Sequence, residues 1–200
     1  MSPHDIELFA AVRAVVRALD QLRVDYFVGG SIASGIHGEP RQTVDADLVA
    51  ALAGRQAAPL VELLRPQFYA DLPSILIATE RQSSFNLIHL ETMVKIDVFV
   101  TWRTDFGRVQ LSRRVRRALD TPEPVEFYVA TPEDTVLAKL QWYRAGGETS
   151  DRQWRDVLGV LKVQAGALDR AYLRDWAARL ALADLLRRAL DDAGLPPDNP

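Results

Sequence analysis

A short segment of the chain, 41–49, alternates between apolar and polar residues. The alternation predicts a β-strand, because successive side chains of a strand point to opposite faces. The face expected to enter a hydrophobic core consists of Val44, Ala46 and Leu48. The face expected to stay open consists of Thr43, Asp45 and Asp47. The pattern therefore places two carboxylates side by side on an accessible surface.

A second alternating segment, 93–100, follows a strand expected at 84–90, and the turn at Glu91 and Thr92 makes the two a hairpin. Its apolar face consists of Val94, Ile96, Val98 and Val100. Its other face consists of Lys95, Asp97 and Phe99. Asp97 is the only acid of this run, and it is therefore a candidate for a third carboxylate near the first two.

Apolar residues recur at helical spacing between these strands and after them. The expected helices are 5–22, 32–37, 59–64, 73–78, 132–144, 150–163 and one or two between 168 and 193. Thr131 is a candidate N-cap for the helix that starts at Pro132. With further short strands at 26–28 and 125–130, this order predicts an α+β fold. It consists of a mixed β-sheet flanked by helices and a C-terminal helical region.

We expect a core at 1–130, a helical region packed on it at 131–193, and a frayed tail at 194–200. The 200 residues are 48% hydrophobic and 26% charged, as in ordinary globular proteins, and they include no cysteine. No apolar run is long enough to span a membrane, and the first residues are acidic where a signal peptide is basic. These features predict a cytoplasmic protein without disulfides, thiolate zinc sites or a membrane partner.

The net charge of −3 does not indicate a basic surface for nucleic acid. One stretch, 102–120, is nevertheless rich in arginine. It forms either a solvated face or a contact with phosphate or RNA.

The neighbouring carboxylates of Asp45 and Asp47 need a compensating charge. At a separation of roughly 5 Å and an effective dielectric of about 20, they repel each other by about 3 kcal/mol. A hard divalent cation such as Mg²⁺ reverses the sign of this energy. Upstream, Gly29 and Gly30 allow an anion to approach the backbone, and Ser31 is a candidate cap for the next helix.

The G-G-S at 29–31, followed by R-x-T-x-D-x-D at 41–47, resembles the signature of the DNA polymerase β-like nucleotidyltransferase superfamily. The resemblance implies a nucleoside triphosphate (NTP) held at the G-S, and two Mg²⁺ ions, or Mn²⁺ in their place. The catalytic and metal-binding residues it implies are Asp45, Asp47 and Asp97.

The segment TPEDTVLAKLQWYRAGGETSDRQWRDVLGVL resembles one found in the AbiEii toxin-like branch of minimal nucleotidyltransferases. The resemblance implies that Lys139 and Asp156 lie near the nucleotide. A lysine among apolar neighbours needs an anionic partner, and either a triphosphate or Asp156 itself would serve. The nucleotide-binding residues expected overall are Gly29, Gly30, Ser31, Arg41, Thr43, Lys139 and Asp156. The alternative for Arg41 is a surface residue that does not contact the nucleotide.

The resemblance implies a nucleotidyltransferase that moves a nucleoside monophosphate from an NTP to a hydroxyl acceptor and releases pyrophosphate. Three classes of acceptor remain as alternatives: tRNA, a protein hydroxyl and a small compound such as an aminoglycoside. The toxin-like branch adds a cognate antitoxin as a partner. The alternative is a catalytically inactive nucleotide-binding or regulatory module with the same fold.

Overall fold

The computed structural model describes residues 2–100, 103–119 and 125–195. The chain divides into two compact units. The first comprises Met1–Gly29 and Gln42–Ala130, and the second comprises Gly30–Arg41 and Thr131–Pro200. The boundaries between the units thus fall within the G-G-S segment, directly after Arg41 and directly before Thr131.

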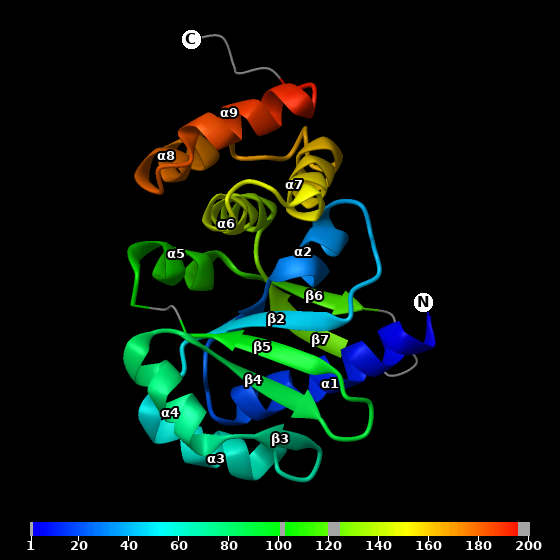
Figure 1. Cartoon of the computed structure of the whole chain (residues 1–200), viewed down its shortest axis with the longest axis vertical. Helices are drawn as coiled ribbons and strands as arrows, with labels where there is room; N and C mark the ends of the chain where they lie inside the picture. The colour runs from blue at the N-terminus through cyan, green and yellow to red at the C-terminus, as the bar shows by residue number, and fades with distance from the viewer. Residues whose placement is uncertain (1, 101–102, 120–124, 196–200) are drawn as a thin grey trace. The chain divides into compact units, whose positions relative to one another are not determined.

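The first unit is built on a sheet of seven strands in the described part of the chain, in the order β3-β4-β5-β2-β1-β7-β6 (Figure 1). Its strands are β1 (Tyr26–Val28), β2 (Asp45–Ala50), β3 (Phe68–Ala70), β4 (Ser84–His89), β5 (Lys95–Phe99), β6 (Val115–Leu119) and β7 (Val125–Val129). β2 and β5 are parallel, as are β1 and β7, and all other neighbours are antiparallel. The predicted mixed sheet and the predicted β4–β5 hairpin are confirmed.

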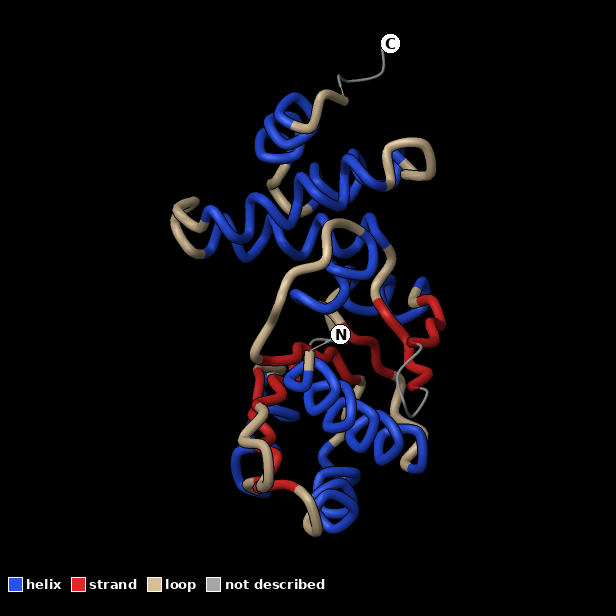
Figure 2. The backbone as a smooth tube through the Cα atoms, turned by 90° about the vertical axis from the view of Figure 1, so that its right-hand side faces the viewer, coloured by secondary structure: helices blue, strands red, loops and turns tan. Residues whose placement is uncertain are grey.

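Three helices of the first unit cover one face of this sheet (Figures 1 and 2). The helices of this unit are α1 (Pro3–Gln21), α3 (Gly54–Leu64), α4 (Leu72–Arg81) and α5 (Asp105–Arg113), of which α1, α3 and α4 form the cover. The side chains on one face of β2 and β5 are buried, and these are Ala46, Leu48, Ala50, Ile96 and Val98. The alternation predicted for the two strands therefore separates a core face from a more accessible one.

The start of β2 differs from the prediction. The strand begins at Asp45, so Arg41 and Thr43 lie in the preceding loop, and Val44 is 68% exposed instead of buried. The prediction for Val44 was wrong because residue 44 precedes the ladder that fixes the alternation. His4 of α1 contacts this loop through its Nε2, which lies 3.1 Å from the carbonyl oxygen of Thr43.

The second unit is helical in its described residues. Its helices are α2 (Gly30–His37), α6 (Pro132–Ala145), α7 (Asp151–Val163), α8 (Arg170–Arg179) and α9 (Ala183–Asp192). α2 packs against both α6 and α7. The Oγ1 of Thr131 accepts a hydrogen bond from the backbone N–H of Asp134 at 3.2 Å, so the predicted N-cap of α6 is confirmed.

Parts of two predicted segments lie outside the described residues. They are Trp102 and Asp120 at the ends of the arginine-rich stretch, and 196–200 of the expected tail. Gly194 and Leu195 are described, and their backbone N–H groups donate to carbonyl oxygens of α9. None of the described helices has the length and the hydrophobicity that crossing a membrane would require.

Candidate functional site

The accessible face of β2 and β5 carries the acids that the sequence singled out. The two strands pair in register, with Asp47 opposite Asp97 and Asp45 opposite Lys95. Neighbouring strands of a sheet lie about 4.8 Å apart, and paired residues of parallel strands point to the same side. Asp45, Asp47 and Asp97 are each partly exposed, in contrast to the buried residues between them. These three acids and Lys95 are called the acidic face below.

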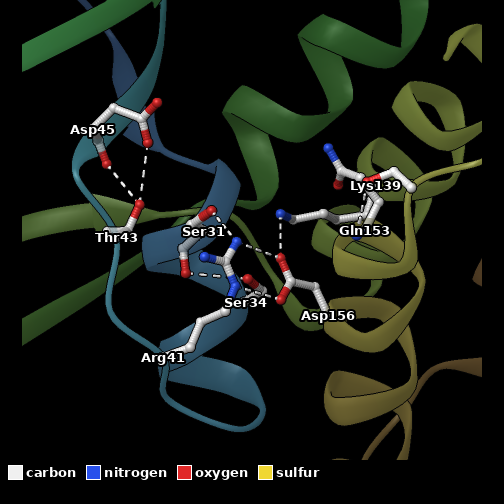
Figure 3. Close-up of polar contacts among 9 residues, drawn as sticks. Ser31, Ser34, Arg41, Thr43, Asp45, Lys139, Gln153 and Asp156 are labelled. Carbon is white, nitrogen blue, oxygen red and sulfur yellow. Dashed lines mark hydrogen bonds and ion pairs between the residues drawn. The ribbon is translucent and has the colours of Figure 1, made fainter.

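Two contacts organise the acidic face. The Nζ of Lys95 lies 2.7 Å from the Oδ2 of Asp97. The Oγ1 of Thr43 donates to the Oδ1 of Asp45 at 3.1 Å (Figure 3). The hydrogen bond to Asp97 raises the pKa of Lys95, and the charges of Asp97, Asp45 and Asp47 add to this effect against the opposing effect of desolvation. Lys95 thus pairs directly with Asp97, and the charges of Asp45 and Asp47 act on it from a greater distance.

The donor chemistry of the acidic face suits a hard divalent cation, since carboxylate oxygens are the ligands that Mg²⁺ prefers. Among the described residues, however, no group of three or more His, Asp or Glu side chains is gathered closely enough to hold a metal ion. The acids also have partners within the chain, such as Thr43 for Asp45 and Lys95 for Asp97. The acids are therefore placed on one surface but not drawn together around one point.

The three residues of the G-G-S segment differ in their surroundings. The N–H of Gly29 donates to the carbonyl oxygen of Asp47 at 2.8 Å, so this N–H extends the sheet. Gly30 has φ +53°, a conformation that favours glycine, and it is the first residue of α2. Ser31 lies within the first turn of α2 and not before it, so the expected capping role for Ser31 was wrong.

A charged cluster of the second unit joins Arg41, Lys139 and Asp156 (Figure 3). The Nζ of Lys139 on α6 lies 2.6 Å from the Oδ2 of Asp156 on α7. The guanidinium of Arg41 contacts both carboxylate oxygens of Asp156, with Nε 2.8 Å from Oδ1 and Nη2 3.0 Å from Oδ2. The Nη2 of Arg41 also donates to the Oγ of Ser31 at 2.6 Å. The ion pair between Lys139 and Asp156, one of the two alternatives for this lysine, is therefore present.

The charged cluster is largely shielded from solvent. The exposed fractions of the side chains are 5% for Asp156, 7% for Lys139 and 27% for Arg41. Burial by itself raises the pKa of the Asp156 carboxyl, but the hydrogen bonds from Arg41 and Lys139, together with their positive charges, outweigh burial and lower the pKa. Two cations share one carboxylate here, so the cluster retains a net positive charge.

A close contact between two backbones holds α2 against α7 and so positions the charged cluster. A Cβ built on Gly38 would lie 2.7 Å from the backbone N of Val160 and 2.8 Å from the carbonyl C of Gly159. The side chain of Gln164 also donates to the carbonyl oxygen of His37 at 2.8 Å. Sequence reasoning missed this contact, because the only signal is a glycine in each of two segments far apart in the chain.

Several arginines of the arginine-rich stretch have acidic partners within the first unit. Arg114 contacts the Oδ1 of Asp25 at 2.6 Å. Arg108 pairs with Asp105, and Arg116 pairs with Glu126. These pairs partly neutralise the stretch.

No model of a protein family and no curated protein matches the sequence. Solved structures do match. An antigenic nucleotidyltransferase-like protein from Paracoccidioides brasiliensis is 19% identical, with a TM-score of 0.54 over 94% of this chain and 92% of that chain. The antibiotic-resistance factor ANT(2″)-Ia is 13% identical, with a TM-score of 0.55 over 94% of this chain and 99% of that chain. Its complex with adenylyl-2″-tobramycin has a TM-score of 0.53 at 11% identity, over 86% and 96% of the two chains.

These similarities show that the chain has the nucleotidyltransferase fold, as predicted from the G-G-S and D-x-D segments. At such low identity, the likeness concerns the fold alone.

Proposed function

We propose that this protein is a metal-dependent nucleotidyltransferase, which moves a nucleoside monophosphate from an NTP to a hydroxyl acceptor. The observation that carries the proposal is the register of β2 and β5. It sets Asp47 beside Asp97 and leaves Asp45 on the same accessible face. The buried side chains of β2 and β5 lie on the opposite face, so the packing of these two strands does not account for the three acids.

In this reaction, the acceptor oxygen forms a bond to the α-phosphorus of the NTP while the bond to the bridging oxygen breaks and pyrophosphate leaves. Asp45, Asp47 and Asp97 would hold divalent ions, which supply positive charge for the attacking and leaving oxygens. Asp97 is also the candidate to take the proton of the acceptor hydroxyl. Thr43 keeps the carboxylate of Asp45 in place through its hydrogen bond.

The family resemblance implies that the G-S at 30–31 holds the triphosphate and that Lys139 and Asp156 lie near the nucleotide, and we add Arg41 as a further charged contact. The net positive charge of the charged cluster supports this assignment for its two cations. In this assignment Asp156 does not contact phosphate itself. It holds the guanidinium of Arg41 and the ammonium of Lys139 in fixed positions before the nucleotide binds.

For the acceptor, we infer a small compound that carries amines beside its hydroxyl groups. The acidic face attracts ammonium groups, and the chain has a net charge of −3. Pairing of Arg108, Arg114 and Arg116 with acids weakens the case for RNA. One of the similar structures contains an adenylylated aminoglycoside, which fits this chemistry.

The test incubates the full chain with α-labelled NTPs and Mg²⁺ and offers three acceptor pools separately. The pools are tobramycin as the amine-bearing small molecule, cellular RNA and lysate protein. Label in tobramycin supports the proposed acceptor class. Label in RNA instead supports a toxin of the AbiEii type with a cognate antitoxin, and label in protein supports nucleotidylation of a protein hydroxyl.

A variant with Asp45→Asn and Asp47→Asn is the control, and any label that it transfers at the wild-type rate contradicts the assigned chemistry. Absence of label from all three pools, combined with NTP binding measured by calorimetry, supports the alternative of an inactive nucleotide-binding module.

A further inference from the structure

The accessible face of the sheet continues beyond the acidic face onto β4 and β3. By register, Asn86 of β4 lies beside Asp97, and Ile88 of β4 lies beside Lys95. Tyr69 of β3 lies in turn beside Ile88. Paired residues of neighbouring strands point to the same side of a sheet, so these side chains share one face with the acids. Asn86, Ile88 and Tyr69 are called the β3–β4 surface below.

The β3–β4 surface presents a large aromatic side chain to solvent. Tyr69 is 59% exposed, and Asn86 is exposed as well, whereas Ile88 is half-buried. The residues next to them in sequence, Phe68 and Leu87, are buried on the opposite face, which the helices cover. A single exposed apolar residue is ordinary in a folded protein. Tyr69 is distinguished by its place in a row of side chains that begins at the acids.

This row offers different contacts along its length. The ammonium of Lys95 pairs with Asp97, and its methylene stem belongs to the residue beside Ile88, so the apolar part of the row begins there. The amide of Asn86 both donates and accepts hydrogen bonds, which suits hydroxyl groups beside Asp97. The ring of Tyr69 has a face on which an ammonium group or the apolar side of another ring can lie.

The spacing of the strands sets the length of a ligand that would use the whole row. β5 and β3 are separated by β4, and neighbouring strands lie about 4.8 Å apart, so the row extends roughly 10 Å from Asp97 on β5 to Tyr69 on β3. A single sugar-sized ring does not reach both strands, whereas a compound of several linked rings does.

We propose that the β3–β4 surface binds the distal part of the acceptor, which is a hydroxylated, amine-bearing compound of several rings. Its reacting ring lies at the acidic face, its neighbouring hydroxyl groups bond to Asn86, and a further ring lies on Tyr69. Tyr69 is thereby a specificity-determining residue that takes no part in the transfer itself. This inference rests on the proposed function, because the acidic face fixes where the reacting ring lies.

The test measures binding of two probes to the full chain by nuclear magnetic resonance titration, without nucleotide or metal. The probes are tobramycin and 2-deoxystreptamine, which is the central ring of tobramycin alone. Tyr69→Ala should weaken the binding of tobramycin about threefold to tenfold, because the contact with the aromatic ring is lost. It should change the binding of 2-deoxystreptamine by less than about twofold, because one ring does not extend from the acids to β3.

Two further variants separate loss of the ring from a general loss of exposed apolar surface. Tyr69→Phe keeps the ring and should bind tobramycin within about twofold of the wild type. Ile77→Ala removes a 49% exposed side chain from α4, which covers the opposite face, and should leave the affinity unchanged. Since Tyr69 is exposed, Tyr69→Ala should stay folded, as circular dichroism checks. In the labelling assay it should raise KM for tobramycin and change kcat by less than about twofold.

The proposal is overturned if the wild type does not bind tobramycin, if Tyr69→Ala binds it as the wild type does, or if Ile77→Ala weakens binding equally. Equal losses for the two probes contradict the assigned length of the acceptor. A wild type that sediments as a dimer and a Tyr69→Ala variant that sediments as a monomer also overturn it, because a second copy then occupies the β3–β4 surface.

The fate of this proposal is separable from that of the proposed function. Binding of tobramycin that depends on Tyr69, without transfer of label to any acceptor, contradicts the proposed function alone. Transfer of label to tobramycin with an unchanged KM in Tyr69→Ala contradicts the role of Tyr69 alone.

Discussion

The acidic face and the charged cluster use the same kinds of side chain in opposite ways. On the acidic face, three carboxylates lie on the same face as one ammonium, which pairs with Asp97, and all four groups are partly exposed on two adjacent strands. In the charged cluster, two cations share one carboxylate, and Lys139 and Asp156 are buried between helices. Among its own four groups, the first arrangement has more carboxylates than cations, whereas the second has more cations than carboxylates.

The difference indicates that the two regions respond differently to loss of a charge. Removing one member of a buried, hydrogen-bonded pair leaves an uncompensated charge and is strongly destabilising. Removing one of several exposed like charges costs little stability. Substitutions on the acidic face should therefore reduce activity but change the free energy of unfolding little. Substitutions in the charged cluster should lower the free energy of unfolding.

The largest loss of stability is expected for Lys139→Met. The carboxylate of Asp156 keeps the guanidinium of Arg41 but loses its charge-assisted hydrogen bond from Lys139, so the free energy of unfolding should fall by about 2–3 kcal/mol. Urea unfolding followed by circular dichroism measures this change. Lys162→Met is the matched control on an exposed lysine and should change stability by less than about 0.5 kcal/mol. Equal effects of the two variants would show that the cluster does not stabilise the second unit.

The next largest effect is expected for Gly38→Ala. The new Cβ would lie 2.7 Å from backbone atoms of α7, which cannot move aside as a flexible side chain can, so a loss of about 1–3 kcal/mol should follow. Gly166→Ala is the control, because a Cβ there meets nothing within 4 Å. Urea unfolding of both variants gives the comparison, and a Gly38→Ala variant as stable as the control would contradict the close approach of α2 to α7.

The sequence was most informative where structure is local. Alternation along 45–49 and 94–98 identified both faces of β2 and β5, because burial of one face fixes the register of the whole strand. Thr131 and Pro132 located the start of α6, because capping depends on neighbouring residues. Val44 was placed wrongly, because alternation alone does not show where a strand begins.

Contacts between distant segments could not be derived in the same way. The bond from Arg41 to Asp156 joins residues 115 positions apart, and it depends on the close approach at Gly38. The family resemblance drew attention to Lys139 and Asp156 but did not join Arg41 to them. Lys95 was recognised only as a strand residue, because its pairing with Asp97 depends on side-chain conformation within a strand.

A smaller effect is expected on the pH dependence of stability, which the carboxylate of Asp156 in the charged cluster should influence. Because the pKa of Asp156 is lowered on folding, its contribution to stability is fully present above the pKa of the unfolded chain, about 3.9, and is lost as pH falls through the lower pKa of the folded protein. Asp156→Asn should therefore be less stable than the wild type at pH 7, and the difference should shrink below about pH 4. Urea titrations across this pH range measure the unfolding free energies of both proteins. A difference between them that stays constant down to acid pH would contradict the link between the charge of Asp156 and stability.

The smallest effect on stability is expected on the acidic face. Asp45→Asn removes one exposed charge and keeps a side-chain oxygen that can accept from Thr43, so the free energy of unfolding should change by less than about 0.5 kcal/mol. The measurement is the same urea titration, run beside Lys139→Met. A loss as large as that of Lys139→Met would mean that both regions are structural.

The most direct test compares transfer of label from α-labelled NTP by the wild type and by Asp45→Asn, with the folded fraction of each protein checked by circular dichroism. Our account predicts Mg²⁺-dependent labelling of an acceptor by the wild type and a reduction of roughly a thousandfold or more in the folded variant. Labelling at the wild-type rate by a folded Asp45→Asn variant would contradict the assignment of the acidic face as the catalytic site.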